Sequence, residues 1–343
     1  MNNLKIHFLN VGHGDCTIID FPERLTVVDI NNCKKLAKES EDELRTRYRI
    51  KYTPNPFFPS TAVGSISTAI KVASSIEQDK ARLTDPLAYL RANFPGQPIF
   101  RYIQSHPDMD HMAGLSSLVN HERVPIINFW DTEHSIEKDE SAAKWQNVNF
   151  DVKDWHTYNS LRRSKSDPTV LFLKAGNKGQ FYSDDGIWLW APFDEEKKND
   201  PDADPNAFSY VLLIQFGKCN IVLGGDLPSE KWAQLHRKWS GEFPKIHLLK
   251  ASHHGRKSGY HMESVKAMNP DITIVSVGEL KKKDDASASY ERFSSIGCFS
   301  TLDHGDIIAT CWEDGDVWLR NRDGMRIDRP DFSLGSLIAS VGR

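Results

Sequence analysis

Hydrophobic and polar positions along the chain predict many short strands, which lie mainly near its two ends. Three β-rich runs fill the first thirty residues, KIHFLNV, CTIIDF and LTVVDI, and the tight glycine turn GHGD separates the first two. A hairpin with the turn EDGD, IIATCWEDGDVWLRNR, is expected near the other end. Between them, further strands are predicted in PIFRYIQS, GIWLWAPF, YVLLIQF, CNIVLGG, KIHLLKAS and DITIVSV.

Helical patterns fall between these strands. The charged stretch KKLAKESEDELRTRYRIKY is helix-prone and is followed by the proline-rich loop TPNPFFPS. Residues 85–94 predict a short helix with Asp85 as N-cap and Pro86 in its first turn. A further helix is expected over residues 113–121, whereas residues 131–186 are poorly patterned. Strands interrupted by helices predict a layered α/β domain.

Composition narrows the class of protein. The 343 residues carry 43 Lys+Arg against 47 Asp+Glu, a net charge of −4, which excludes a strongly basic nucleic-acid wrapper and an acidic tail protein. No apolar run approaches the ~20 residues of a membrane helix, and the first residues do not resemble a signal peptide. The five cysteines form no CxxC pair. Reduced thiols, a cytoplasmic location and no membrane partner are therefore expected.

The segment SHPDMDHMAGL, residues 105–115, is the sharpest chemical signal. It places His106, Asp108, Asp110 and His111 within six residues, directly after an apolar strand and before a predicted helix. A polar turn that caps a helix would explain one aspartate but not four potential ligands. So many potential ligands in a short segment suit a pair of divalent metals better than a single structural zinc. A structural zinc has all four coordination positions filled by protein side chains, which are usually thiolates.

Two later segments also place polar residues after apolar strands. In IVLGGDL, Asp226 follows a Gly-Gly pair, although a lone aspartate at a strand end is usually only a turn residue. In LLKASHHGRKSGY, the adjacent His253 and His254 cannot both point the same way from an extended segment. One of them can bind metal while the other supports the site or faces a substrate.

Taken together, these motifs resemble the metallo-β-lactamase fold. More narrowly, FLNVGHGDCTII, LTVVDINN, SHPDMDHMAGL, NAFSYVLLIQFGKCNIVLGGDL and LLKASHHG are similar to the hydrolase domain of the competence (DNA-uptake) protein ComEC and its stand-alone relatives. The resemblance spans roughly residues 4–310. It implies a four-layer αββα fold in a single domain over residues 1–343, with insertions at about 31–95 and 121–200.

The resemblance also implies a site with two divalent metal ions, Zn²⁺ or Mn²⁺. It implies that His106, Asp108 and His253 lie on one metal, Asp110 and His111 on the other, and that Asp226 bridges them. His253 is preferred to His254 only because it lies nearer the strand end. A metal-bound hydroxide would then be the nucleophile. Asp110 is expected to serve catalysis as well, and His254 or solvent would protonate the leaving group.

The chain departs from the family pattern at three places. The wider family has a histidine as the second ligand where this chain has Asp108. Where the wider family has a histidine before the GD strand pair, this chain has PNAFSY, with Asn206 or Ser209 in its place. Many relatives carry a histidine where this chain has Lys283, in KKDDAS. The second metal would then need a water, a substrate oxygen or His304, or would be weak or missing.

Phosphodiesters are the expected substrates, in nucleic acid or in a small nucleotide. Arg256 and Lys257 directly follow the HHG motif and would attract phosphate, with Asn206 and Lys283 as further substrate-binding candidates. Two alternatives stay open. One is an ester or amide hydrolase that uses the same site, and the other is a binding or regulatory protein with a degenerate site. The sequence does not predict an oligomeric state.

Overall fold

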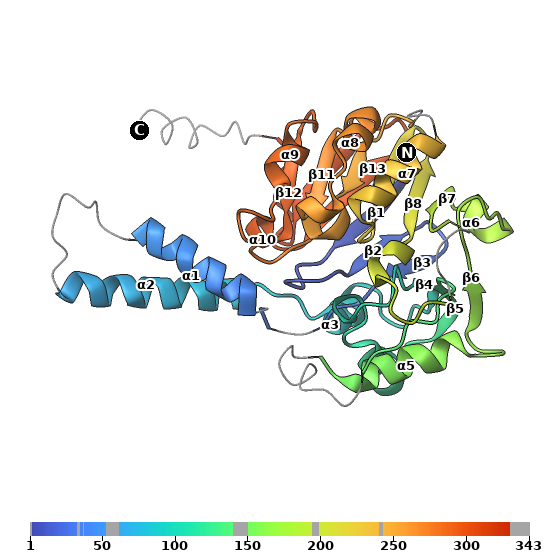
Figure 1. The fold of residues 1–343 in the computed structure, drawn as a ribbon, viewed down its shortest axis with the longest axis horizontal. Coiled ribbons are helices and arrows are strands. Elements are labelled where there is room, and N and C mark those ends of the chain that lie inside the picture. The colour runs from blue at the N-terminus through green and yellow to red at the C-terminus, as the bar shows by residue number, and fades with distance from the viewer. Residues whose placement is uncertain are drawn as a thin grey trace.

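Two mixed β-sheets face each other at the centre of the computed structural model (Figure 1). The structure describes residues 2–32, 35–36, 38–52, 62–139, 150–193, 199–239 and 243–329. One sheet has eight strands in the order β14-β13-β1-β2-β3-β4-β5-β6, and the other has six in the order β12-β11-β10-β9-β8-β7. Within the described part of the chain, no helix is both long and apolar enough to cross a membrane.

The strands of the eight-stranded sheet are bounded as follows: β1 Asn3–Phe8, β2 Thr17–Asp20, β3 Leu25–Val28, β4 Ile99–Ile103, β5 Ile126–Asp131, β6 Thr169–Phe172, β13 Ile307–Trp312 and β14 Val317–Asn321. Those of the six-stranded sheet are β7 Ile187–Ala191, β8 Val211–Phe216, β9 Cys219–Leu223, β10 Leu248–Lys250, β11 Ile272–Val275 and β12 Gly297–Ser300. The helices are α1 Lys38–Tyr52, α2 Ala62–Ala81, α3 Pro86–Asn93, α5 Val152–Arg162, α6 Gln180–Asp184, α7 Ser229–Lys238, α8 Met262–Met268, α9 Ser287–Glu291 and α10 Thr301–His304.

Three hydrophobic clusters define four layers. The central cluster lies between the sheets and joins residues such as Phe8 and Ile103 of one sheet to Leu223 and Ile274 of the other. A second cluster packs α3 and α5 on the outer face of the eight-stranded sheet. A third packs α7, α8 and α9 on the outer face of the six-stranded sheet. The expected αββα architecture is therefore confirmed.

Parallel strands determine where polar loops meet. β3 to β6 run parallel in the first sheet, and β9 to β12 run parallel in the second. Because parallel neighbours end at the same edge of a sheet, the loops that follow β3 and β4 lie together, as do those that follow β9 and β10. The sequence motifs occupy these four loops.

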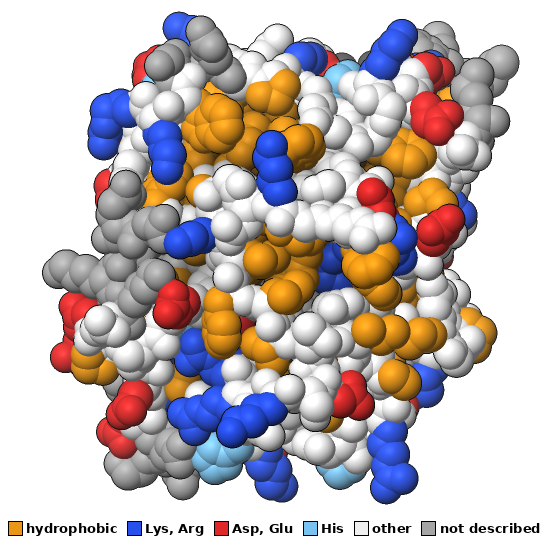
Figure 2. Space-filling view, turned by 90° about the vertical axis from the view of Figure 1, so that its right-hand side faces the viewer, with side chains coloured by type: hydrophobic (Ala, Val, Ile, Leu, Met, Phe, Trp, Pro, Cys, Tyr) orange, Lys and Arg blue, Asp and Glu red, His pale blue; other side chains and the backbone are white. Residues whose placement is uncertain are grey.

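Helices α1 and α2 form an antiparallel hairpin that projects from the layered body (Figure 1). Leu44 of α1 packs against Val72 and Ile76 of α2, and Tyr48 donates a hydrogen bond to Asp79 over 2.7 Å. On another side of the body, near β6, α6 and β7, hydrophobic, basic and acidic side chains are intermixed (Figure 2).

Several sequence expectations for individual elements hold. The helix with Asp85 as N-cap is present as α3, and the Asp85 carboxylate accepts hydrogen bonds from the backbone N–H groups of Leu87 and Ala88. The expected hairpin near the end of the chain is β13–β14. The proline-rich loop TPNPFFPS lies outside the described residues.

Other elements differ from the expectation. The helix expected over 113–121 is reduced to a short π-helical segment, Ser117–His121. Gly114 has a φ of 99°, which a continuous helix does not allow. The sequence pattern did not indicate α2, nor α5, β6 and α6 within residues 131–186.

Candidate functional site

Polar residues after four parallel strands converge at the common edge of the two sheets. Asp29 follows β3, and the 104–111 loop follows β4. Asp226 follows β9 after two glycines, and His254 follows β10. The backbone N–H of His253 donates to the carbonyl of Gly225 over 3.0 Å, which holds the β9 and β10 loops together.

The backbone of these loops adopts conformations that are rare for residues other than glycine. Asp29, His253 and His254 have φ values of 60°, 50° and 53°, in the left-handed region. Such conformations cost of order 1–3 kcal/mol each and concentrate at functional sites. The turn at His253 and His254 breaks the alternation of an extended chain, so sequence spacing alone does not show which imidazole faces inward.

Five side chains form the centre of the site. Nε2 of His254 lies 3.2 Å from Oδ2 of Asp226 and 3.3 Å from Oδ2 of Asp110. Nε2 of His111 lies 3.4 Å from the same Asp226 oxygen. The ring of His106 lies 4.1 Å from the ring of His111, measured between centroids. Asp226 thus occupies the middle of the cluster, with imidazoles from both sheets around it.

Each of the three imidazoles is oriented through its other nitrogen. Nδ1 of His111 donates to Asp29 over 2.8 Å, Nδ1 of His254 donates to the carbonyl of Ser276 over 3.1 Å, and Nδ1 of His106 contacts Oγ of Ser105 at 3.0 Å. The contacts fix the rings so that every Nε2 faces the site. Such hydrogen bonds to the second nitrogen are typical of metal-binding histidines.

Several buried polar atoms at this point lack hydrogen-bond partners among the described residues. They are Nε2 of His106, His111 and His254, and Oδ1 of Asp15 and Asp226. Unpaired buried polar atoms are costly, so a group of them in one place indicates a missing ligand. Imidazole nitrogens and carboxylate oxygens are donors that suit Zn²⁺ or Mn²⁺, and the residues present therefore fit a metal centre.

Charge in the cluster supports the same interpretation. Burial alone would lower the pKa values of His111 and His254, but the Asp226 carboxylate raises both above the usual value for histidine. Conversely, burial would raise the pKa of Asp226, but His254 and His111 hold it well below its usual value. The carboxylates therefore draw positive charge onto the imidazoles, and divalent cations would supply that charge in place of the protons.

The ligating atoms form two overlapping groups. Asp15, His111, Asp226 and His254 offer one set, and His13, Asp110 and His254 offer a second. In each set the ligating atoms lie within 4.8 Å of one another. His254 is common to both, because its Nε2 faces Asp226 and Asp110 together.

The structure places His254, and not the preferred His253, in both groups. Nδ1 of His253 contacts Oγ of Ser258 at 3.0 Å, and its ring centroid lies 6.2 Å from that of His254. The proposed role of His254 as a proton donor to the leaving group therefore competes with a role as a ligand.

Asp108 lies at the margin of the cluster. One carboxylate oxygen is 3.8 Å from Nε2 of His106, and the other accepts a hydrogen bond from Nζ of Lys138 over 2.8 Å. No sequence pattern indicated Lys138, which lies in the poorly patterned stretch after β5.

Of the two residues expected to replace the missing histidine, Ser209 contacts the cluster. Its Oγ accepts a hydrogen bond from the backbone N–H of Asp226 over 3.1 Å. Asn206 lies in a short 3₁₀ helix, Pro205–Phe208, where its backbone N–H is bonded to Asp204.

The basic substrate-binding candidates divide into two groups. Nη2 of Arg256 lies 3.4 Å from Nε2 of His13, and the side chain is only 18% exposed. Lys257 donates from Nζ to the carbonyl of Lys283 over 2.7 Å, and both lysines are exposed. Arg256 therefore lies against the cluster, and the two lysines belong to the surface beside it.

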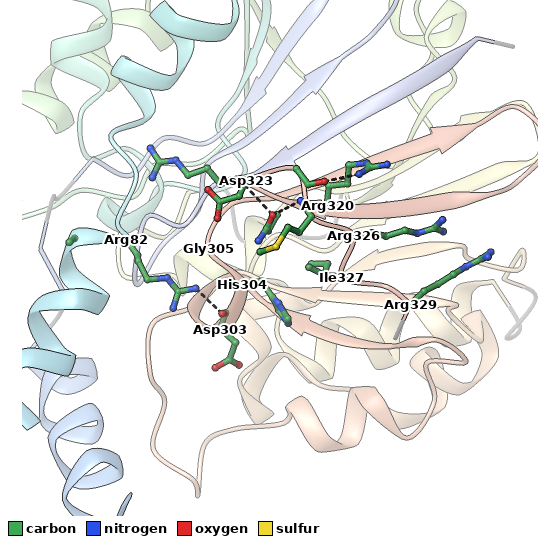
Figure 3. A pocket seen from close by; sticks show the side chains of 14 residues that line it. Arg82, Asp303, His304, Gly305, Arg320, Asp323, Arg326, Ile327 and Arg329 are labelled. Carbon is green, nitrogen blue, oxygen red and sulfur yellow. Dashed lines mark hydrogen bonds between the residues drawn. The ribbon is translucent and has the colours of Figure 1, made fainter. Parts of the chain in front are cut away.

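His304 lies outside both groups of ligating atoms. It lines a separate pocket with Arg82 and Asp303 (Figure 3), and its ring packs against Phe299 at a centroid distance of 5.7 Å. In this structure His304 therefore does not take the place of the histidine that many relatives carry where this chain has Lys283.

Two further buried carboxylates belong to the site; the sequence did not indicate a role for Asp29, and for Asp15 the family resemblance implied only a structural hydrogen-bonding role. Asp29 accepts hydrogen bonds from His111 and from both the backbone and the side chain of Ser105. Asp15, in the GHGD turn, accepts a hydrogen bond from the buried Nζ of Lys250. The sequence signal for both was their place in the motifs FLNVGHGDCTII and LTVVDINN, which resemble those of the family.

Comparisons with known proteins give likenesses at the level of three-dimensional structure. No protein family and no curated protein matches the chain. Similar solved structures include the metallo-β-lactamase-fold protein YhfI from Bacillus subtilis, with 11% identity and a TM-score of 0.43 over 93% of this chain and 100% of that one. An isothiocyanate hydrolase from Delia radicum gut bacteria has 12% identity and a TM-score of 0.44, over 92% and 99%. Igni18, a metallo hydrolase from Ignicoccus hospitalis, has 10% identity and a TM-score of 0.42, over 92% and 99%. All three TM-scores are below 0.5, so the fold is assigned from its own layers and strand order.

Proposed function

We propose that this protein is a metal-dependent hydrolase of phosphodiester bonds that holds two divalent cations, Zn²⁺ or Mn²⁺. One observation carries the proposal. Nε2 of His111 and Nε2 of His254 face the Asp226 carboxylate at 3.4 and 3.2 Å, and Nε2 of His106 lies 3.8 Å from Asp108; all three nitrogens are buried, and none forms a hydrogen bond with the described residues.

The donors divide around Asp226. Asp15, His111 and His254 would hold one cation together with it, and His13 and Asp110 offer donors for the other, with His106 and Asp108 beside them. When bound, such cations supply Lewis acidity toward water and toward phosphoryl oxygens. Asp29, Ser105 and the Ser276 carbonyl keep the three rings in place before any ligand arrives, so little reorganisation is needed.

The preference for phosphodiesters rests on two cations beside the cluster. Arg256 lies against His13, and Lys138 lies against Asp108, with side chains 18% and 17% exposed. Partly buried guanidinium and ammonium groups attract anionic substrates more strongly than fully solvated ones do. A neutral ester or amide would gain nothing from them.

Hydrolysis of bis(p-nitrophenyl) phosphate by metal-reconstituted protein tests the proposal, with metal content measured on the same sample. We expect activity together with bound metal. Asp226→Asn should reduce kcat/KM by more than about a hundredfold. Mutation of a residue that merely orients a metal ligand already lowers metal affinity or activity 10–100-fold. Asp184→Asn, which changes an exposed carboxylate outside the cluster, is the matched control.

Other outcomes separate the alternatives. Cleavage of p-nitrophenyl acetate without cleavage of the phosphodiester would replace the proposal by an ester hydrolase. Little bound metal and no activity after addition of Zn²⁺ or Mn²⁺ would contradict the enzyme altogether and favour a binding protein with a degenerate site.

A further inference from the structure

A cavity of about 940 Å³ lies away from the site described above, between the end of α2, helix α10 and the hairpin that follows β14. Its lining contains none of the residues of the histidine cluster. Figure 3 shows Arg82 on one side of this cavity and His304 below it, and it shows Arg326 and Arg329 extending in the same direction on the opposite side. We call it the arginine pocket.

The lining of the arginine pocket is rich in arginine. The described lining residues include five arginines and two aspartates, and Asp79, Asp306 and Asp328 pair with three of the arginines from outside the lining. Burial lowers the pKa of His304, which keeps that ring neutral. By contrast, basic and acidic side chains are intermixed on the face shown in Figure 2. The five arginines are Arg82, Arg320, Arg322, Arg326 and Arg329.

Two of these guanidinium groups donate to backbone carbonyls, and Nη1 of one of them, Arg82, also lies 4.0 Å from the Asp79 carboxylate. Nη2 of Arg82 donates to the backbone carbonyl of Asp303 over 2.7 Å, and Nη1 of Arg320 donates to the carbonyl of Gly324 over 2.6 Å. Carbonyl partners restrict the side chain but leave its full charge, and the remaining N–H donors, for a ligand.

The other arginines differ in their partners. Arg326 forms a bidentate pair with Asp328 and is neutralised. Nε of Arg322 lies 3.8 Å from the buried carboxylate of Asp306, too far for a hydrogen bond. Arg329 has no salt-bridge partner among the described residues.

The same pocket also has an apolar part. Met325, on the tip of the hairpin, is 60% exposed, and Ile327 lines the cavity beside it. An exposed, polarisable methionine beside unneutralised guanidinium groups suits a ligand that joins an apolar group to anionic ones. The charges are spread across the cavity from Arg82 to Arg329, so several anionic groups fit better than one.

We propose that the arginine pocket binds molecules that carry two or more linked phosphate groups on an organic moiety. Guanidinium groups recognise phosphate through paired N–H donors, and a pocket of this volume accommodates a ligand the size of a nucleotide. The phosphates can come from the phosphoanhydride chain of a nucleotide or from the backbone of a short oligonucleotide. The proposal does not depend on metal binding or hydrolysis at the histidine cluster.

Calorimetric titration of the metal-loaded protein tests this proposal with two probes, inorganic tripolyphosphate and the hexanucleotide of thymidylate. We expect saturable binding of at least one probe, weakened by added salt. Preference for the first identifies a phosphoanhydride ligand, and preference for the second identifies a phosphodiester ligand.

Variants locate the binding. Arg320→Gln and Arg322→Gln should each weaken it roughly tenfold or more, as expected for loss of a charged hydrogen bond. Arg292→Gln, which removes an exposed arginine outside the pocket, should change it little. Both pocket variants should unfold at the wild-type temperature and keep the wild-type rate on bis(p-nitrophenyl) phosphate. Asp226→Asn should bind the probes as the wild type does.

Two results would overturn the proposal. One is the absence of saturable binding of either probe. The other is binding that persists in Arg320→Gln and Arg322→Gln but is lost in Asp226→Asn, which would assign it to the histidine cluster.

Discussion

Lys138 donates a hydrogen bond from Nζ to Oδ1 of Asp108 over 2.8 Å, and so brings an ammonium group to the margin of the histidine cluster. The pair is partly buried, with side-chain exposures of 17% and 30%. Lys138 therefore neutralises Asp108, and the pair joins the segment after β5 to the loop after β4.

Replacing Lys138 by methionine should separate substrate binding from metal binding. Lys138→Met keeps the aliphatic stem but removes the charge, so we expect KM for bis(p-nitrophenyl) phosphate to rise roughly tenfold, equivalent to about 1.4 kcal/mol. The metal content should stay the same or increase, because Asp108 loses its competing cation. Lys153→Met, on the exposed surface of α5, should leave KM unchanged. An unchanged KM in Lys138→Met would show that this ammonium group does not contact substrate.

A pair of matched variants decides which histidine of the HHG motif binds metal. His253 and His254 share a left-handed backbone conformation, and asparagine tolerates it better than most residues. We expect His254→Asn to lose bound metal and His253→Asn to retain it, because only His254 contacts Asp110 and Asp226. Metal analysis after gel filtration measures the difference. The reverse result would restore the assignment that the sequence favours.

Asp29 should act on the metal centre through His111. Asp29→Asn fits the φ of 60° but exchanges a carboxylate for an amide against Nδ1 of His111. Loss of such an orienting carboxylate lowers metal affinity by about 10–100-fold, so we expect an effect of that size. Competition with a chromogenic chelator measures the affinity, with Asp184→Asn as control. Wild-type affinity would mean that the ring is held by its other contacts.

Acid should destabilise the fold through His7, a buried residue of β1. Burial, and then the charge of Lys5, lower the pKa of His7 to about 4 from 6.5. Between these values the unfolded chain binds a proton that the folded chain does not, so stability falls as the pH decreases through this window. The loss reaches about 3 kcal/mol and is absent above pH 6.5.

Urea unfolding of wild type and His7→Gln at several pH values measures this contribution. The variant should lose less stability on acidification, and His121→Gln, at an exposed position, should behave as wild type. Parallel pH profiles for wild type and His7→Gln would assign the acid sensitivity to other groups.

The predictable part of the site is the part that is local in sequence. His106, Asp108, Asp110 and His111 fall within six residues, and an apolar strand before them indicates where they point. Lys138 comes thirty residues after Asp108, beyond β5, and no local pattern connects the two. The contact exists only because the parallel strands β4 and β5 place their following loops side by side.

The layered fold was also evident in the strand pattern, whereas some helices were not. Runs of β-branched and other apolar residues predicted most of the strands in both sheets. Helix α2 is rich in serine and alanine, and its described apolar residues pack on α1 and near Leu302 of α10 in a small cluster apart from the sheets. The choice between His253 and His254 is open in the sequence for another reason. The alternation of side chains applies to extended backbone, and both residues lie in a left-handed turn.

The division of the site between the sheets has a consequence during synthesis. Asp15 of the first sheet is joined to Lys250 of the second, and the central cluster likewise needs Asp226 and His254 in addition to Asp110 and His111. The ribosome makes the second pair more than a hundred residues after the first, a delay of roughly ten seconds at 5–20 residues per second. Until then the early half of the cluster has no counterpart, so any cation that the complete cluster binds can be held in the final arrangement only after the second half of the fold has been made.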